Sequence, residues 1–297
     1  MSSYLVNFIS LLFQVLSLAI LAPVIAWLYG DDPTVGHNDL LDENLGYPLG
    51  VAGGISGTHW LGLVPQRGYD LFLQLIFGMR TSLTIAVISS VVGVGFGAVL
   101  GVVAGYLGGW FDRVAVWFTD VMLAFPFFLF TIALVPTIST RLADKYGAIS
   151  DWKRIAVLIG VFALFGWMGT ARLVRGQVIS LREREYVEAA RAAGASARHI
   201  IFRQILPNTW APILVTFSLS IPITVTAEAA LSFLSIGIVE PTPDLGRLIF
   251  SGVRNMSNVG LVPGFVLLPG ILIFVLVLAF NLLGDSLRDA LDPRSNK

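Results

Sequence analysis

The sequence predicts an all-α polytopic membrane protein with about six transmembrane helices. Of its 297 residues, 56% are hydrophobic and only 13% are charged, and the mean hydropathy is +0.80. A soluble domain is about 45–50% apolar and about 25% charged, so this composition excludes an ordinary soluble protein. A bilayer core takes roughly 20 apolar residues per helix. Charge-free runs that are also strongly apolar cover 1–30, 81–111, 121–140, 155–171, 204–227 and 255–284.

The charge-free runs place the spans at about 4–29, 80–107, 113–136, 154–177, 209–237 and 262–284. The first span is expected to stay uncleaved, because residues 1–30 lack the basic start of a signal peptide. The sequence then divides into 1–79 (first helix and loop), 80–284 (a five-helix core that includes segment 178–208) and 285–297 (a tail). Prolines that can kink or interrupt a span are Pro126, Pro222, Pro263 and Pro269.

Charge distribution predicts the orientation. Segment 178–208 is rich in arginine, whereas the loop 30–79 carries six acids and one arginine. Loops rich in Lys and Arg stay on the cytoplasmic side. We therefore expect segment 178–208, both termini and the tail in the cytoplasm, and loop 30–79 outside.

Composition also narrows the chemistry. The 19 basic residues balance the 19 acidic residues, so nothing indicates a nucleic acid partner. There is no cysteine, and the three histidines, His37, His59 and His199, lie far apart in sequence, so no metal site, cofactor or catalytic residue is expected on this chain. An intramembrane hydrolase is disfavoured because the sequence has neither G-x-S-x-G nor H-E-x-x-H. An ion-coupled transporter or channel and a membrane scaffold remain as alternatives.

Two features of the predicted spans each allow two interpretations: acidic residues inside the spans, and a face of small residues. Asp120 and Glu228 are costly in hydrocarbon, so each is expected to face a transport pathway or to form a buried structural pair. Small residues at four-residue spacing let helices approach closely in lipid. Such a face serves internal packing or contact with a partner subunit, and it comprises Gly93, Gly97, Gly101 and Gly105.

Segment 178–208 is predicted to form two short helices joined by a sharp corner. Residues 185–193 are strong helix formers, Gly194 can end that helix, and Ser196 can cap a second one that runs toward Pro207. Alanines at the corner would let it enter a groove on another protein. The alternative is a solvated helix that merely joins two spans.

The motif in this segment resembles a known family. Glu188-Ala189-Ala190, Gly194 and Leu206-Pro207 are similar to the EAA loop of permease subunits in binding-protein-dependent ABC importers, with the pattern E-A-A-x3-G-x9-I-x-L-P. Gln204 departs from it, standing where the pattern has Ile. Segments 167–177, 227–234, 281–285 and 287–294 resemble the second permease of the dipeptide, oligopeptide and nickel branch. The first loop matches that branch less well, because Leu63 and Val64 replace a Thr and an Asp.

The resemblance implies a type I ABC importer-like permease for di- or oligopeptides, or for nickel or another small solute, in the cell membrane. It implies a homologous second permease, two cytoplasmic ATPase subunits that bind ATP and Mg, and an extracytoplasmic solute-binding protein. The sequence has no G-x-x-x-x-G-K-[ST] phosphate loop, so ATP must bind elsewhere. Glu188 is expected to cap or brace the loop. The implied coupling residues are Tyr186, Glu188, Ala189, Ala190, Ala193, Gly194, Ala195, Ser196, Leu206 and Pro207.

Overall fold

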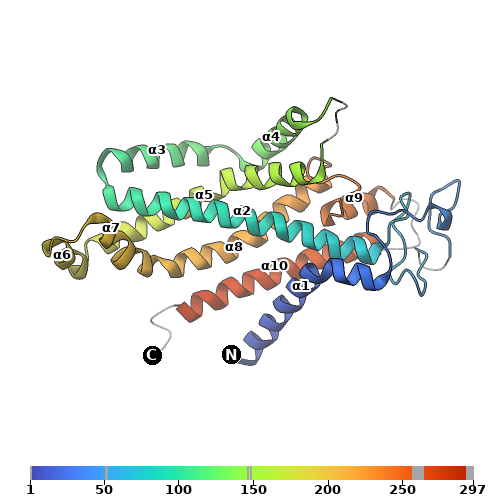
Figure 1. Cartoon of the computed structure of the whole chain (residues 1–297), viewed down its shortest axis with the longest axis horizontal. Coiled ribbons are helices and arrows are strands. Elements are labelled where there is room, and N and C mark those ends of the chain that lie inside the picture. The colour runs from blue at the N-terminus through green and yellow to red at the C-terminus, as the bar shows by residue number, and fades with distance from the viewer. Residues whose placement is uncertain (1, 51–52, 146, 148, 256–263, 292–297) are drawn as a thin grey trace. The chain divides into compact units, whose positions relative to one another are not determined.

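The computed structural model describes residues 2–50, 53–145, 147, 149–255 and 264–291. Figure 1 shows a chain built from helices. Within the described residues there is no β-strand, only the isolated bridges Leu41–Pro48 and Leu63–Asp70 in the first loop, which also holds the 3-10 turn η1 (Asn38–Leu40). The predicted all-α class is therefore confirmed.

The chain forms two compact units. One comprises Met1–Ala86, Val135–Leu158 and Pro222–Ala279, and the other comprises Val87–Leu134, Ile159–Ile221 and Phe280–Lys297. Several long helices contribute one half to each unit. The division predicted from the sequence, at residues 79 and 284, separates segments by their place along the membrane topology and not by their contacts. It stays a prediction.

The first two helices are α1 (Ser2–Tyr29) and α2 (Leu71–Leu107). Helix α1 matches the predicted span, but α2 begins at Leu71 instead of residue 80. The reason is Asp70, whose Oδ1 accepts a hydrogen bond from the Leu73 N–H at 3.0 Å. A carboxylate in this position satisfies an otherwise unpaired amide at the helix start. Arg80, at which the predicted span began, therefore lies well inside the helix.

The predicted third span, 113–136, is wrong as a single helix. The chain forms α3 (Gly109–Ala124) and α4 (Phe127–Leu142), which are bent by 84° relative to each other. Pro126 lacks an N–H and disfavours helical conformation in the residue before it. Phe125 accordingly adopts φ −78° and ψ 132°, which is extended.

The remaining long helices are α5 (Asp151–Arg182), α8 (Leu206–Phe233) and α10 (Gly264–Leu291). Before α8 lie α6 (Glu185–Ala192), α7 (Ala197–Ile200) and the π-helical turn η3 (Ile201–Ile205). Helix α10 continues to Leu291 and so includes the start of the predicted tail. Residues 262–263 of the predicted last span, Pro263 among them, and residues 292–297 lie outside the described residues.

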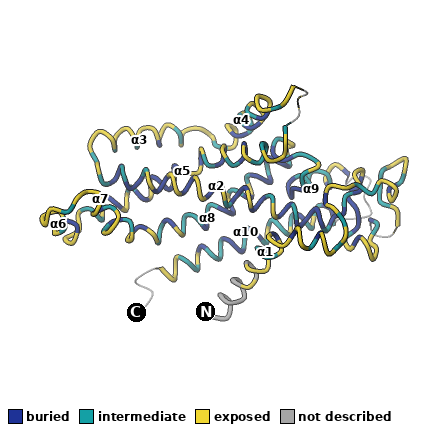
Figure 2. Tube along the Cα trace, viewed as in Figure 1, coloured by how far each residue is buried: buried dark blue, intermediate teal, exposed yellow. Residues whose placement is uncertain are grey.

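Four described helices are long and apolar enough to cross a bilayer, and there are five if α3 and α4 count as one bent span. Helix α1 adds a shorter apolar stretch, Phe13–Tyr29. Figure 2 shows exposed positions along α3 and α1. Among them, Trp27 and Trp110 are 77% and 72% exposed, which suits a lipid or protein neighbour. These features confirm a polytopic membrane protein.

Sequence analysis missed one helix, α9 (Leu245–Arg254). Asp244 begins it, because its Oδ1 accepts a hydrogen bond from the Arg247 N–H at 2.8 Å. Helix α9 packs tightly in its unit: a Cβ on Gly246 would overlap the backbone of Ala229 in α8. Its charges, Arg247 and Arg254, kept this segment out of the apolar runs.

Candidate functional site

The segment that carries the EAA-like motif forms a bent helix pair, here called the elbow (residues 185–207). Helix α6 ends at Ala192, and Gly194 follows with a φ of +79° and donates a hydrogen bond from its N–H to the Arg191 carbonyl at 3.0 Å. Glycine adopts this left-handed conformation without strain and most other residues do not, so the corner depends on it. Ser196 Oγ then accepts a hydrogen bond from the His199 N–H at 3.3 Å and starts α7. The predicted short helix and the sharp corner after it are confirmed, but the predicted second short helix is wrong: α7, η3 and α8 form one continuous helix, Ala197–Phe233.

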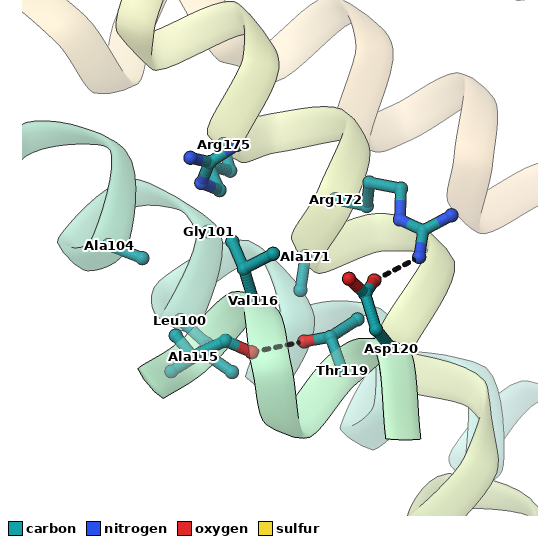
Figure 3. A pocket seen from close by; sticks show the side chains of 10 residues that line it. All are labelled: Leu100, Gly101, Ala104, Ala115, Val116, Thr119, Asp120, Ala171, Arg172 and Arg175. Carbon is teal, nitrogen blue, oxygen red and sulfur yellow. Dashed lines mark hydrogen bonds and ion pairs between the residues drawn. The ribbon is translucent and has the colours of Figure 1, made fainter. Parts of the chain in front are cut away.

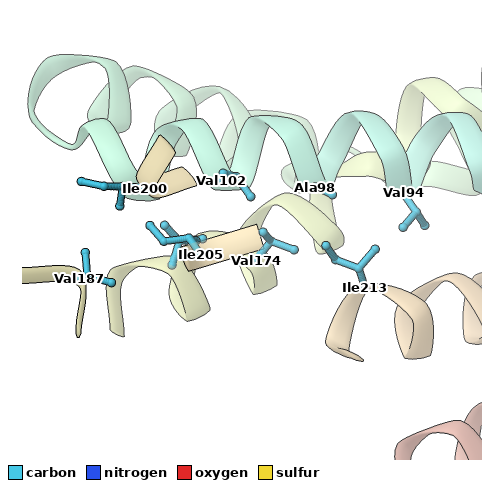
Figure 4. Close-up of a cluster of buried hydrophobic side chains, with 9 residues drawn as sticks. Val94, Ala98, Val102, Val174, Val187, Ile200, Ile205 and Ile213 are labelled. Atoms are coloured by element: carbon cyan, nitrogen blue, oxygen red, sulfur yellow. The ribbon is translucent and has the colours of Figure 1, made fainter. Parts of the chain in front are cut away.

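Three apolar side chains anchor the elbow. Val187, Ile200 and Ile205 are each at most 1% exposed. They join one buried cluster with residues of the C-terminal halves of α2 and α5 and of α8 (Figure 4). Because the anchors come from all three parts of the elbow, α6, α7 and η3 each pack against these long helices.

Most of the predicted coupling residues line the opposite, outward face of the elbow. Tyr186, for example, is 41% exposed although it is aromatic. A small, exposed and partly apolar surface of this kind suits insertion into a groove. The exposed residues are Tyr186, Glu188, Ala189, Ala193, Gly194, Ser196 and Pro207, and the half-buried ones are Ala190, Ala195 and Leu206.

The expectation that Glu188 caps or braces the loop stays a prediction, although Glu188 lies in the first turn of α6. Its side chain is exposed and forms no hydrogen bond or ion pair with any other residue that the structure describes. Gln204, which departs from the motif, is half-buried, and its neighbour Ile205 is fully buried.

The four glycines of α2 pack against α5 within one unit. A Cβ on Gly93 would lie 3.3 Å from the Gly166 backbone, and one on Gly101 would lie 3.0 Å from the Arg175 nitrogen. Gly97 and Gly105 meet α5 in the same way. Helix α5 therefore covers this face within the chain, which agrees with the internal-packing alternative.

Asp120 lies at a hollow of about 360 Å³ that α2, α3 and α5 enclose (Figure 3). Its Oδ1 accepts a hydrogen bond from Arg172 at 2.5 Å, and both side chains are more than half exposed. Arg175 binds both carboxylate oxygens of Asp112, at 2.5 and 2.6 Å. These two ion pairs tie α3 to α5, so both arginines of the hollow already have acidic partners.

Glu228 lies in a different setting, fully buried within the other unit. Ser82 Oγ donates a hydrogen bond to its Oε2 at 2.7 Å, and Ser232 Oγ donates one to its Oε1 at 2.8 Å. Ser232 Oγ also accepts a hydrogen bond from the Ile238 N–H at 3.0 Å. Glu228 therefore holds α2 and α8 together and does not face an open pathway in this conformation.

Asp244 is the acidic neighbour that sequence analysis missed. It is 1% exposed, and its Oδ2 has no hydrogen-bond partner among the described residues. Burial and the nearby carboxylate of Glu228 raise the pKa of Asp244 well above its ordinary value. The signal in the sequence was the Asp that precedes an amphipathic ten-residue segment, which is typical of a helix N-cap.

The sequence of the chain matches a known protein family. A family model described as "binding-protein-dependent transport system inner membrane component" matches residues 97–297. The chain belongs to this family. The match contains the elbow, its anchors and the glycine face of α2 from Gly97 onward.

Relatives of this permease are named as permease proteins of transport systems. It is 39% identical to the glutathione transport system permease protein GsiD of Pectobacterium atrosepticum, over 81% of this chain and 74% of that protein. It is 37% identical to the oligopeptide transport system permease protein OppC of Mycobacterium bovis, over 80% of this chain and 76% of that protein. It is 39% identical to the dipeptide transport system permease protein DppC of Alkalihalophilus pseudofirmus, over 81% of this chain and 74% of that protein. The resemblance predicted from the sequence is confirmed.

A solved structure supports the fold. The permease aligns with a chain of the inward-facing MetNI methionine ABC transporter with a TM-score of 0.57 and 19% identity, over 75% of this chain and 98% of that chain. At this identity the likeness concerns the fold alone. It agrees with the all-α, polytopic architecture described above.

Proposed function

We propose that this permease is the translocation subunit of an ATP-driven importer of di- or oligopeptides in the cell membrane. The observation that carries the proposal is the elbow, which exposes small side chains outward and anchors itself through Val187, Ile200 and Ile205. The dipeptide, oligopeptide and glutathione transport names of the relatives support a peptide substrate.

The elbow is the proposed handle for a cytoplasmic ATPase subunit. Its face would seat in a groove of that subunit, and its free carboxylate at Glu188 and nearby arginines would pair with charges there. When two ATPase subunits close on ATP and Mg, the elbow moves with them and shifts α2, α5 and α8. The closed ATPase pair must bind one state of the permease about 5.5 kcal/mol better to move the equilibrium from 1:99 to 99:1.

The remaining partners follow from the same proposal. A homologous second permease completes the pathway, and an extracytoplasmic binding protein delivers the solute near loop 30–79. The chain itself performs no catalysis, because ATP hydrolysis takes place on the ATPase subunits. Glu228 acts as a structural carboxylate, and its two serine donors support this role over a place in the pathway.

Transport by the reconstituted complex tests the proposal. The permease is co-expressed with the second permease, the ATPases and the binding protein encoded with it, and proteoliposomes are given labelled dipeptide, glutathione or Ni²⁺. We expect ATP-dependent uptake of a peptide that stops when the ATPases are omitted. Uptake of Ni²⁺ alone would replace the peptide assignment, and uptake without ATPases would refute the proposed mechanism.

A further inference from the structure

The first loop brings together two histidines that the sequence analysis treated as unrelated. The ring centroids of His37 and His59 lie 4.7 Å apart. Asp31 joins them, and one potential ligand atom from each of these three residues lies within 4.8 Å of the others. The expectation that no metal site exists depended on the absence of cysteine and on the separation of the histidines along the chain. The loop removes that separation by folding back before α2.

Asp31 and His37 form the more accessible half of the cluster. The Oδ2 atom of Asp31 lies 2.9 Å from Nε2 of His37, and the side chains are 15% and 26% exposed. The other oxygen of Asp31, Oδ1, accepts a hydrogen bond from the Asp32 N–H at 2.7 Å. That bond fixes the carboxylate with Oδ2 toward His37, so both potential donor atoms are held in place without an ion.

His59 forms the buried half of the cluster, and Asp70 fixes the orientation of its ring. Its Nδ1 lies 2.9 Å from Oδ2 of Asp70, and the two side chains are 8% and 0% exposed. Its other ring nitrogen, Nε2, makes no hydrogen bond with any residue in the described part of the chain. In metal sites a ligating histidine usually donates its second ring N–H to a carboxylate, which sets the tautomer and the ring orientation.

Asp70 is itself held by two further donors. The Tyr29 hydroxyl donates to its Oδ2 at 2.9 Å, and the Leu73 N–H donates to its Oδ1 at 3.0 Å. The carboxylate is therefore fixed at the junction of α1 and α2. A buried carboxylate that orients an imidazole with a free Nε2 is the outer shell that a metal-binding histidine requires.

We propose that Asp31, His37 and His59 bind one divalent transition-metal ion of the zinc type. Imidazole donors favour Zn²⁺, Co²⁺ and Ni²⁺, whereas Mg²⁺ and Ca²⁺ prefer oxygen donors. Three protein ligands leave a fourth tetrahedral position for water or for a group of another molecule. Asp31 and His37 then coordinate the ion in place of their mutual hydrogen bond, with His37 as the neutral tautomer that carries its proton on Nδ1 and binds through Nε2.

The site would join the two ends of the first loop. Asp31 and His37 follow α1 closely, and His59 precedes α2, so one ion ties the loop back onto itself. The inference does not depend on the peptide-importer proposal, because it concerns binding of an ion by the folded loop in any transport state.

Cobalt titration of the purified, full-length permease tests the site. The protein carries an affinity tag without histidine and is freed of metal with a chelator. We expect one Co²⁺ per chain with the visible absorption of a tetrahedral ion, displaced by Zn²⁺ and not by Mg²⁺. A wild-type chain with no saturable, one-to-one binding of Co²⁺ or Zn²⁺ would overturn the inference.

Variants locate the ion. His37→Ala and Asp31→Asn change partly exposed side chains and are expected to abolish the visible band in a protein that stays monodisperse. Asp70→Asn keeps the three ligands and is expected to weaken binding about 10–100-fold, since it loosens His59. His199→Ala is the matched control, because it removes the third histidine, which is exposed in the elbow. Equal loss of cobalt in His199→Ala, or full retention in His37→Ala, would place the ion elsewhere and refute the site.

Discussion

A Cβ atom at position 97 of α2 would overlap the backbone carbonyl of Trp167 in α5. Gly97→Ala therefore cannot be accommodated without moving a helix, and overpacking of this kind costs about 1–3 kcal/mol. We expect a lower apparent unfolding temperature in detergent. Gly95→Ala is the matched control, because nothing lies within 4 Å of a Cβ there. Equal effects of both substitutions would contradict the assigned helix contact.

Ile205 is the anchor of the elbow that is most easily tested. Ile205→Ala empties a fully buried position, and such truncations cost about 2–5 kcal/mol. Phe202 lies in the same π-helical turn but is 60% exposed, so Phe202→Ala should change stability by less than about 0.5 kcal/mol. Thermal unfolding of the two variants measures the difference. A larger loss in Phe202→Ala would reverse the assignment of the inner and outer faces.

Asp244 predicts a pH dependence of stability. Its pKa is raised in the folded chain, so the folded state keeps a proton that the unfolded state releases. The contribution to stability is therefore full below the ordinary pKa of Asp, about 4, and is lost as the pH rises toward the raised value. Asp244→Asn cannot titrate, so its unfolding temperature should fall less between pH 5 and pH 8 than that of the wild type.

The control for this pH profile is Asp39→Asn, because Asp39 is exposed and forms no side-chain hydrogen bond with another described residue. It should reproduce the wild-type dependence on pH. If Asp244→Asn and the wild type have parallel profiles, burial of Asp244 next to Glu228 does not control the proton.

Gly194 tests the corner of the elbow. A β-branched residue at φ +79° is strained by about 1–2 kcal/mol, so Gly194→Val should open the corner and misplace α6 relative to α7. Gly194→Asn is the control, because Asn tolerates the left-handed region. In reconstituted complexes we expect uptake to be lost in the Val variant and largely kept in the Asn variant. Normal uptake with Val would show that the corner angle is unimportant.

The sequence predicted most of the membrane helices because the cost of charge in lipid leaves long charge-free runs. It indicated a possible kink at Pro126 but still predicted one continuous span across it, since the residues on both sides of the proline are apolar. It also began α2 too late, because Arg80 lies within the helix and Asp70, which starts it, had been assigned to the loop.

The elbow was predictable because its signals are local: helix formers, then Gly194, then the capping Ser196. Its anchors were not, since Val187, Ile200 and Ile205 differ from other apolar residues only through what they contact. The pairs His37–His59 and Glu228–Asp244 were not predictable for the same reason. Each joins segments that only tertiary folding brings together, and no short-range pattern records such a contact.

The central claim is that an ATPase subunit holds the outward face of the elbow. The chain has no native cysteine, so a single Ala189→Cys provides one reactive thiol on that face, and Ser150→Cys provides one in the exposed α4–α5 loop. We predict that a short thiol cross-linker joins Ala189→Cys, and not Ser150→Cys, to the ATPase in the assembled complex, and that ATP changes the yield. A complex that hydrolyses ATP and imports substrate while Ala189→Cys stays freely reactive and unlinked would contradict the account.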